Sequence, residues 1–515
     1  MSTPDAGVSK ATSREWVGLA VLALPCLLYS MDLTVLNLAV PKLSAALRPT
    51  SSELLWIVDI YGFVLAGALI PMGVLGDRVG RRRLLLTGAA AFGCASILAA
   101  FAPGVEALIA ARALLGLAAA TLAPSTLSLI RSMFLDPKQR TFAIGVWIAS
   151  FSAGGAIGPL IGGLMLQFFW WGSVFLINVP VMVLLLAVGP KLLPEFRNPQ
   201  AGKLDILSAA LCITTILAVI YGIKRIAEQG TDWAAAVAIV SGIAIGAVFL
   251  RRQRKLADPF IDLDLFRRMT FSAALAVNIF GFFVAFGAFL LIAQYFQLVL
   301  GLSPLVAGLW SAPSGIAFVA GAMLTPRMTN HVKPPHVIAG GFVIAAFGFG
   351  LLTQTGTAHD LAVVATAYAV FSLGLAPVFT LASDLIVSTA PPERAGAAAG
   401  ISEMSAELGG ALGIALLGSV VTLIYRATVA GTIAGSLPPD VLEAARDTLG
   451  GALSVAGALS DEHSAALVSV SRNAFVEAFR AVALASAAIT LIAAAAAALL
   501  LGRPRQNLGI ASTSA

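Results

Sequence analysis

The sequence predicts an all-helical protein that crosses a membrane fourteen times. Of its 515 residues, 59% are hydrophobic and only 11% are charged, and the mean hydropathy is +0.93. A soluble globular chain carries about 25% charged residues. A helix needs about 20 mostly apolar residues to cross some 30 Å of hydrocarbon, and the chain contains fourteen stretches of that kind.

These stretches fall into three groups along the chain. They lie at about 16–40, 54–74, 84–101, 107–130, 141–168 and 173–193, then 206–223 and 233–250, and then 271–299, 305–326, 336–354, 361–388, 396–425 and 476–501. The first is too long for a signal-peptide core and is interpreted as a mature helix. We therefore expect a first domain at 1–193, a middle pair with its linkers at 194–269 and a last domain at 270–515. A loop at about 426–475, with short helical patterns such as 441–449, is expected outside the membrane.

The basic residues predict which way the chain is inserted. If the N-terminus is cytoplasmic, 23 of the 32 lysines and arginines fall in inward loops and tails, and eight fall on the outward side. This imbalance satisfies the positive-inside rule. We therefore expect a multi-pass protein of the cytoplasmic (inner) membrane with both termini in the cytoplasm. The formal charge of +6 follows from this topology and gives no reason to expect a nucleic-acid partner.

Charged residues inside the apolar stretches are the candidate functional residues. Asp32 and Asp59 lie in the first two stretches, Arg112 in the fourth, and Glu403 and Glu407 in the thirteenth. An acid at the centre of a membrane helix costs about 2.5 kcal/mol or more, so it marks a functional site by default. The two glutamates are four residues apart and so share one helical face. A helical rise of about 1.5 Å per residue puts the other three at similar depths, where a purely structural salt bridge is the alternative.

The sequence lacks the residue patterns of enzymes, nucleotide-binding sites and metal sites. No segment outside the membrane is large enough for a catalytic domain, and the Gly202-Lys203 pair does not have the spacing of a phosphate-binding loop. The three cysteines fall in apolar stretches without the spacing of a disulfide or metal site, and the four histidines lie in loops or at helix ends. We expect no enzyme activity, cofactor or metal, and an ion gradient as the energy source. A membrane receptor or membrane-embedded enzyme is the distant alternative.

The loop between the second and third stretches carries a motif. It reads Gly73-Val-Leu-Gly76-Asp77-Arg78-Val-Gly80-Arg81-Arg82-Arg83. Its glycines permit a tight turn and close helix approach. The loop resembles the signature loop of the major facilitator superfamily, which controls the rocking of two halves, and this resemblance implies a latch made of Gly73, Gly76, Asp77, Arg78, Gly80, Arg81 and Arg82. A simple topology anchor would explain the arginines, but neither Asp77 nor the glycine spacing.

The fifth stretch contains a stripe of glycines. Gly154, Gly158 and Gly162 share one helical face, Gly163 follows, and Pro159 is expected to kink the helix. Close packing of small residues would explain the glycines alone. The whole string resembles the motif of proton antiporters within the same superfamily, which implies export.

Three further strings resemble the fourteen-helix drug:proton antiporters, notably the exporters of quaternary ammonium compounds. These are 32–41, 56–61, and Arg112 with Gly116, and the resemblance covers essentially the whole chain. It implies two six-helix bundles with two inserted helices and a site near the midplane. It also implies that Asp32, Glu403 and Glu407 couple protons or bind the cation, that Asp59 is an essential acid, and that Arg112 is the arginine of the fourth helix.

The expected partners are therefore the lipid bilayer, protons and a small lipophilic cation. The cation would displace a proton from an acidic cavity, and protons from outside would release it after the halves rock. Aromatic candidates for cation–π contacts are Trp147, Phe151, Phe282, Phe286 and Tyr295. The alternative on the same fold is a dedicated exporter of a single antibiotic or metabolite.

Overall fold

The computed structural model describes residues 10–195, 205–229, 232–256, 259, 263–357, 360–390, 395–433, 439–457, 459 and 461–501. Within these ranges the chain is helical, with no strand, so the predicted all-α class is confirmed. Among the described residues, twelve helices are long and apolar enough to cross a membrane. The other two predicted crossings coincide with helices whose described apolar parts, Ala153–Phe168 and Leu207–Val219, are shorter. The polytopic fold is thus confirmed, and the count of fourteen stays a prediction.

The helices follow one another in three groups. The first group is α1 (Ser13–Leu47), α2 (Ser51–Val79), α3 (Arg81–Ala100), α4 (Val105–Met133), α5 (Pro137–Phe168), α6 (Ser173–Leu176) and α7 (Asn178–Leu192). The second is α8 (Ile206–Gln229) and α9 (Trp233–Gln253). The third is the 3₁₀ turn η1 (Leu265–Arg267), α10 (Met269–Gln294), the π-helical turn η2 (Tyr295–Val299), α11 (Pro304–Thr329), α12 (Pro334–Leu352), α13 (Leu361–Thr389), α14 (Ala395–Ile433), α15 (Pro439–Asp447), α16 (Leu449–Ala456) and α17 (Asp461–Leu501).

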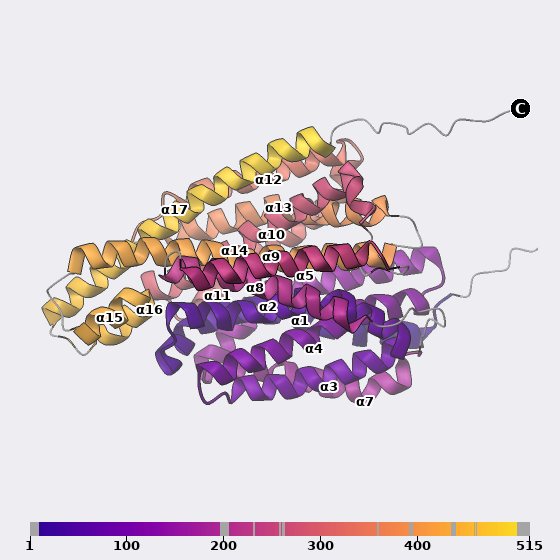
Figure 1. The fold of residues 1–515 in the computed structure, drawn as a ribbon, viewed down its shortest axis with the longest axis horizontal. Helices are drawn as coiled ribbons and strands as arrows, with labels where there is room; N and C mark the ends of the chain where they lie inside the picture. Colours follow the sequence, from indigo (N-terminus) through magenta and orange to yellow (C-terminus); the bar gives the residue numbers. More distant parts are fainter. Residues whose placement is uncertain are drawn as a thin grey trace, which may run out of the picture.

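The first and third groups form two bundles that lie side by side. In Figure 1, α1, α2, α3, α4 and α7 occupy the lower half, and α10, α12, α13 and α17 the upper half. The bundles meet where α5 packs on α11 and α2 packs on α14. We call the end at which α1 begins and α17 ends the terminal end, and the opposite end, where α15 and α16 lie, the capped end (Figure 1).

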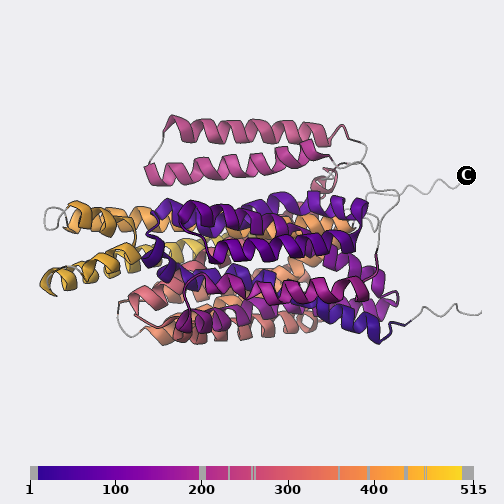
Figure 2. The ribbon, with the colours of Figure 1, turned by 90° about the horizontal axis from the view of Figure 1, so that it is seen from below.

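The middle pair forms a hairpin beside the bundles. Figure 2 shows α8 and α9 running alongside each other at one flank, and α8 contacts both α2 and α14. At the terminal end, Arg252 Nε donates to Asp205 Oδ2 at 2.9 Å and lowers the pKa of that carboxyl to about 2. The pair thus lies against the helices that join the two bundles. The domain boundaries at 193 and 269 remain a prediction.

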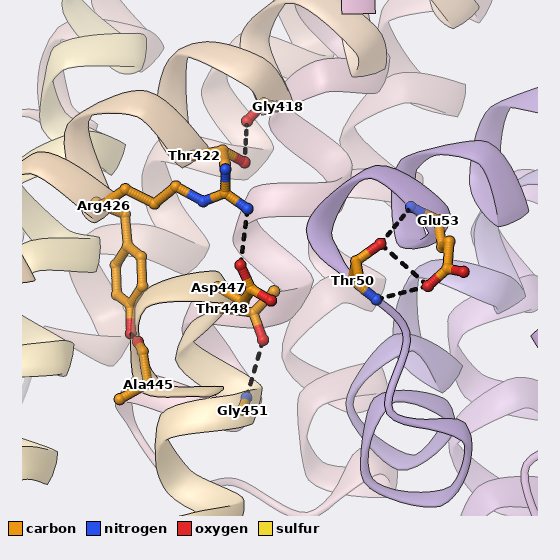
Figure 3. Close-up of polar contacts among 10 residues, drawn as sticks. Thr50, Glu53, Gly418, Thr422, Arg426, Ala445, Asp447, Thr448 and Gly451 are labelled. Carbon is orange, nitrogen blue, oxygen red and sulfur yellow. Dashed lines mark hydrogen bonds and ion pairs between the residues drawn. The ribbon is translucent and has the colours of Figure 1, made fainter. Parts of the chain in front are cut away.

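The segment between the last two predicted crossings is largely helical at the capped end. Both α14 and α17 extend past their apolar stretches, and α15 and α16 lie between them. Arg426 Nη2 pairs with Asp447 Oδ1 at 2.8 Å, and Thr448 Oγ1 caps α16 by accepting from Gly451 N at 2.9 Å (Figure 3). The Arg426–Asp447 pair fixes α15 to α14, and Figure 3 also shows the capping box of Thr50 and Glu53 that begins α2.

Candidate functional site

Asp32 and Arg112 form a buried ion pair inside the first bundle. Arg112 Nη1 lies 2.6 Å from Asp32 Oδ2, and Arg112 and Asp32 are 1% and 6% exposed respectively. The guanidinium also donates to the Ile57 and Val58 carbonyls at 3.1 and 3.2 Å. It therefore joins α4 to both α1 and α2. Removing one partner of such a pair leaves an uncompensated buried charge.

Asn178 of α7 extends this polar cluster. Its Nδ2 donates to Asp32 Oδ1 at 3.4 Å and to Ser96 Oγ at 3.2 Å. Asn178 was not among the predicted site residues, although a lone amide in an apolar stretch is a usable signal. The remaining predicted acid of this level, Asp59, is 1% exposed and directly follows Val58, whose carbonyl accepts from Arg112. Asp32 and Arg112 thus lie at the same level as direct partners. Asp59 lies next to that level, because the residue before it accepts a hydrogen bond from Arg112.

Glu407 lies at the junction of the two bundles. It is 9% exposed, and the Tyr29 hydroxyl of α1 donates to its Oε1. Toward α2, a Cβ added to Gly62 would lie 3.9 Å from Glu407 Oε2. The carboxylate of α14 is therefore held against α1 and α2. Tyr29 was not predicted, although it precedes Asp32 by one helical turn.

Glu403 lies one turn from Glu407 toward the terminal end. The two acids are four residues apart on the continuous helix α14 and so share one face, and both carboxylates lie within electrostatic reach of Tyr29. Glu403 also lies within electrostatic reach of Cys26 on α1. It is half-buried, whereas Glu407 is buried. Glu403 is thus the more exposed of the two acids.

Two aromatic side chains of α5 lie beside the Tyr29 ring on the first bundle. Phe151 of α5 packs edge-on against Tyr29 with centroids 5.3 Å apart, and Trp147 packs on Phe151 at 4.7 Å. Trp147 Nε1 donates to Thr126 Oγ1 at 3.0 Å, which fixes the indole. Two of the predicted aromatic candidates thus lie beside the Tyr29–Glu407 contact.

The aromatic candidates of the second bundle are divided. Phe286 lies against Gly410 of α14, with a Cβ there only 3.1 Å from the ring, and Phe282 stacks on Phe379 with centroids 4.0 Å apart. Tyr295 is fully buried elsewhere: its hydroxyl donates to the Gly356 carbonyl at 2.7 Å. Tyr295 is therefore outside this site.

The glycine stripe of α5 packs against α1, as its spacing predicts. A Cβ on Gly154 or Gly158 would collide with the Leu27 carbonyl or the Thr34 hydroxyl, and one on Gly162 would lie 2.8 Å from Val35 Cγ1. Gly163 points the other way. A Cβ there would lie 2.7 Å from the Pro304 carbonyl of α11, and the Pro159 carbonyl packs on Gly308. The motif therefore holds α5 against α1 and against the opposite bundle at once.

The predicted latch loop is a one-residue turn at the terminal end. Gly80 separates α2 from α3 with φ +117°, a conformation that favours glycine. Gly76 packs on the buried Arg81, whose Nη1 would lie 3.0 Å from a Cβ there. Gly73 faces Pro124 of α4, and Arg78 is exposed. The side chain of Asp77 lies outside the described residues, so its part in the latch stays a prediction.

Arg82 fixes this turn to the end of the first bundle. Its Nη1 donates to the carbonyls of Pro190 and Leu193 at 3.3 and 3.0 Å, and its Nε lies 3.5 Å from Glu195 Oε2. Arg82 therefore clamps the C-terminal end of α7.

Known proteins resemble this chain over nearly its whole length. A family model described as Major Facilitator Superfamily matches residues 22–414. The multidrug efflux pump LfrA of Mycolicibacterium smegmatis is 41% identical over 498 residues, which are 96% of this chain and 98% of LfrA. The methyl viologen resistance protein SmvA of Salmonella typhimurium is 34% identical over 480 residues, 93% of this chain and 96% of SmvA.

A solved structure shares the fold. A bacterial homolog of the human lysosomal transporter Spinster, in an inward-facing and unoccupied conformation, aligns with a TM-score of 0.64 at 17% identity. The alignment covers 96% of this chain and 98% of that one.

Proposed function

The chain belongs to the major facilitator superfamily, and from that membership we propose that it exports lipophilic cationic drugs, dyes or antiseptics across the cytoplasmic membrane in exchange for protons. The protein is a multi-pass membrane transporter of small molecules, not an enzyme. LfrA and SmvA are named for multidrug efflux and for methyl viologen resistance, and both names suit a pump for cationic drugs.

One contact carries the proposal: the hydrogen bond between Tyr29 and Glu407, with Glu403 one turn away. Hydrogen bonds to an ionised acceptor are roughly twice as strong as neutral ones. When Glu407 is ionised, the bond holds α1 against α14; when Glu407 takes up a proton, the bond weakens. The charge of Glu407 is therefore linked to the closeness of the two bundles, which is the link that an antiporter needs.

The cation is proposed to enter beside Glu403 and the Phe151–Trp147 pair. The half-buried Glu403 offers a carboxylate, and the two rings offer faces worth about 0.5–2 kcal/mol each to a desolvated cation. Binding of the cation favours ionised glutamates, so a proton leaves as the cation arrives. The Asp32–Arg112 pair is proposed to position Tyr29, one turn along α1, and to hold α1, α2 and α4 as one rigid unit.

The terminal end is proposed to be cytoplasmic and the capped end external. At the level of Glu407 and beyond it toward the capped end, the bundles contact each other through α5 and α11, through Leu55 against Gly418, and through Gln297 Nε2 donating to the Leu38 carbonyl at 3.2 Å. These contacts support a conformation whose site opens toward the cytoplasm. We propose that the halves 1–193 and 270–515 rock about the site, with 194–269 as the inserted hairpin.

Dye efflux from cells or inverted vesicles tests the function. We expect efflux of a lipophilic cationic dye to stop when the proton gradient is dissipated and to continue when ATP is depleted while the gradient is maintained. ATP-driven efflux in vesicles without a gradient would contradict the proposal. If a susceptibility panel shows that the protein exports a single compound and no cationic dye, the dedicated exporter is favoured instead.

A further inference from the structure

A small polar chamber lies between the bundles, nearer the capped end than Glu407. It has a volume of about 20 Å³ and is lined by Thr34, Asn37, Leu38, Pro159, Phe289, Ala293, Ser311 and Tyr368. Thr34 and Asn37 follow Tyr29 on α1, so the helical rise puts them roughly 8 and 12 Å further toward the capped end. The chamber therefore lies on the line from the Tyr29–Glu407 contact to the external side.

The chamber presents oxygen atoms that accept hydrogen bonds. Asn37 is 4% exposed, and its Oδ1 has no hydrogen-bond partner among the described residues. The Thr34 hydroxyl donates to the Met31 carbonyl at 3.0 Å and the Ser311 hydroxyl to the Ala307 carbonyl at 2.9 Å. Their protons are thus used within their own helices, and their lone pairs remain for a donor inside the chamber.

Tyr368 of α13 lines the chamber together with these residues. Of the described residues that line the chamber, Tyr368 alone titrates and none is charged. A space of about 20 Å³ is far too small for a drug-like cation. It suits one water, which needs about 10–15 Å³ and two to four polar partners.

The antiporter motif of α5 forms the wall of this chamber. Pro159 lines it, and the absence of a side chain on Gly158 leaves room for the Thr34 hydroxyl. The Pro159 carbonyl packs on Gly308 of α11, and Gly163 packs on Pro304 one turn beyond. The chamber is thus closed toward the outside by the α5–α11 contact and would join the external solvent when that contact opens.

We propose that this Thr34–Asn37 chamber binds water and forms the part of the proton route between the external side and Glu407. The proposal rests on the proton antiport proposed above. A proton arriving from outside makes the chamber water a hydronium ion. One O–H bond of that ion breaks, protons shift along a short chain of waters, and one O–H bond forms on a carboxylate oxygen of Glu407. The chamber water is restored, and Tyr29 and Tyr368 remain neutral phenols.

Two substitutions remove the acceptors without adding charge: Asn37→Leu and Thr34→Val. Thr490→Val is the matched control, because Thr490 is a fully buried threonine on α17 that likewise donates to a carbonyl of its own helix, that of Ser486 at 2.9 Å. The full-length protein in liposomes is assayed with ethidium for binding, for dye exchange without a gradient, and for transport driven by an imposed pH difference. We expect binding and exchange within twofold of wild type in both variants, and driven transport at least tenfold lower. The control should be unchanged, and Asn37→Ser, which restores an oxygen acceptor, should recover at least half of the driven rate.

Three results separate the outcomes. Driven transport at wild-type rate in both acceptor variants would overturn the proposal, and so would an equal loss of exchange and driven transport, which indicates a packing role. A wild-type protein that exchanges dye but ignores the pH difference would overturn the antiport itself. Hydroxyl-radical footprinting tests the water directly: we expect labelling of the buried Tyr368 in wild type and a severalfold decrease in Asn37→Leu, and no labelling in wild type would overturn the water site.

Discussion

Tyr29→Phe removes one oxygen atom from the proposed coupling site and leaves the ring in place. The lost group is the hydroxyl that donates to Glu407 across the two bundles. Hydrogen bonds to charged groups contribute about 1.5–3 kcal/mol, and each 1.4 kcal/mol changes an equilibrium or rate about tenfold. We therefore expect gradient-driven dye efflux to fall about 10- to 150-fold. Dye affinity should change much less, because the substituted ring would keep the edge-on contact with Phe151.

The control is Tyr295→Phe. Tyr295 is equally buried, and its hydroxyl donates to the neutral Gly356 carbonyl at 2.7 Å, away from the site. Its loss should lower the free energy of unfolding by about 0.5–1.5 kcal/mol and leave the efflux rate per folded protein unchanged.

A double-mutant cycle makes the test specific. On a Glu407→Gln background, Tyr29→Phe should have little further effect on driven efflux, because the charged partner is already gone. The assay is initial efflux rate in liposomes under a fixed pH difference, normalised to correctly inserted protein. The coupling role is refuted if Tyr29→Phe transports at the wild-type rate, or if its full effect persists when Glu407 is replaced by glutamine.

Three further predictions concern other parts of the molecule. Arg112→Ala leaves Asp32 as a buried unpaired charge and should destabilise the protein by about 3–5 kcal/mol, measured by thermal unfolding in detergent. Arg112→Lys should not restore the stability, because one ammonium cannot form the bonds to both carbonyls and to Asp32. Gly163→Ala brings a Cβ to 2.7 Å from the Pro304 carbonyl and should loosen the α5–α11 contact, so that liposomes leak protons in the absence of substrate. Gly340→Ala is the control: a Cβ at Gly340 has no neighbouring atom within 4 Å, so this variant should leak no more than wild type. Asp77→Asn should lower transport severalfold with insertion intact, because the basic topology signal is retained, and wild-type efflux by this variant would reduce the loop to an anchor.

Much of the candidate site follows from helix geometry alone. A fixed rise per residue put Asp32 and Arg112 at one depth, and the structure pairs them at 2.6 Å. The 3.6-residue period put Gly154, Gly158 and Gly162 on one face, and that face packs on α1. These properties depend on a single helix and on the bilayer, so they are readable from sequence.

The partners across helices were not readable. Tyr29 and Glu407 are separated by 378 residues, and only the meeting of the two bundles brings them together. Asn178 and Tyr29 stand out as single polar groups in apolar stretches, but the sequence does not show which side chains they contact. Tyr295 is recognised as lying outside the site only from its bond to the Gly356 carbonyl.

Helix ends also escaped prediction. Hydropathy predicts the part of a helix that lies in the membrane, and the helix itself can extend beyond that part. The first stretch was predicted at 16–40, yet α1 runs from Ser13 to Leu47. Its start is set by the capping box of Thr12 and Glu15, and its end by Arg48, whose backbone is left-handed. Likewise α17 begins at Asp461, well before the apolar stretch at 476–501.

A lipophilic cation and a proton are proposed to compete for the Glu403–Glu407 pair. The most direct measurement is proton release on substrate binding: tetraphenylphosphonium is added to purified protein in weakly buffered detergent near pH 7, and the pH is followed with an indicator dye. We expect wild type to release protons in step with binding, Glu407→Gln to release fewer, and the Glu403→Gln/Glu407→Gln double variant to release none. Saturable binding by wild type without proton release, or undiminished release by the double variant, would contradict the account.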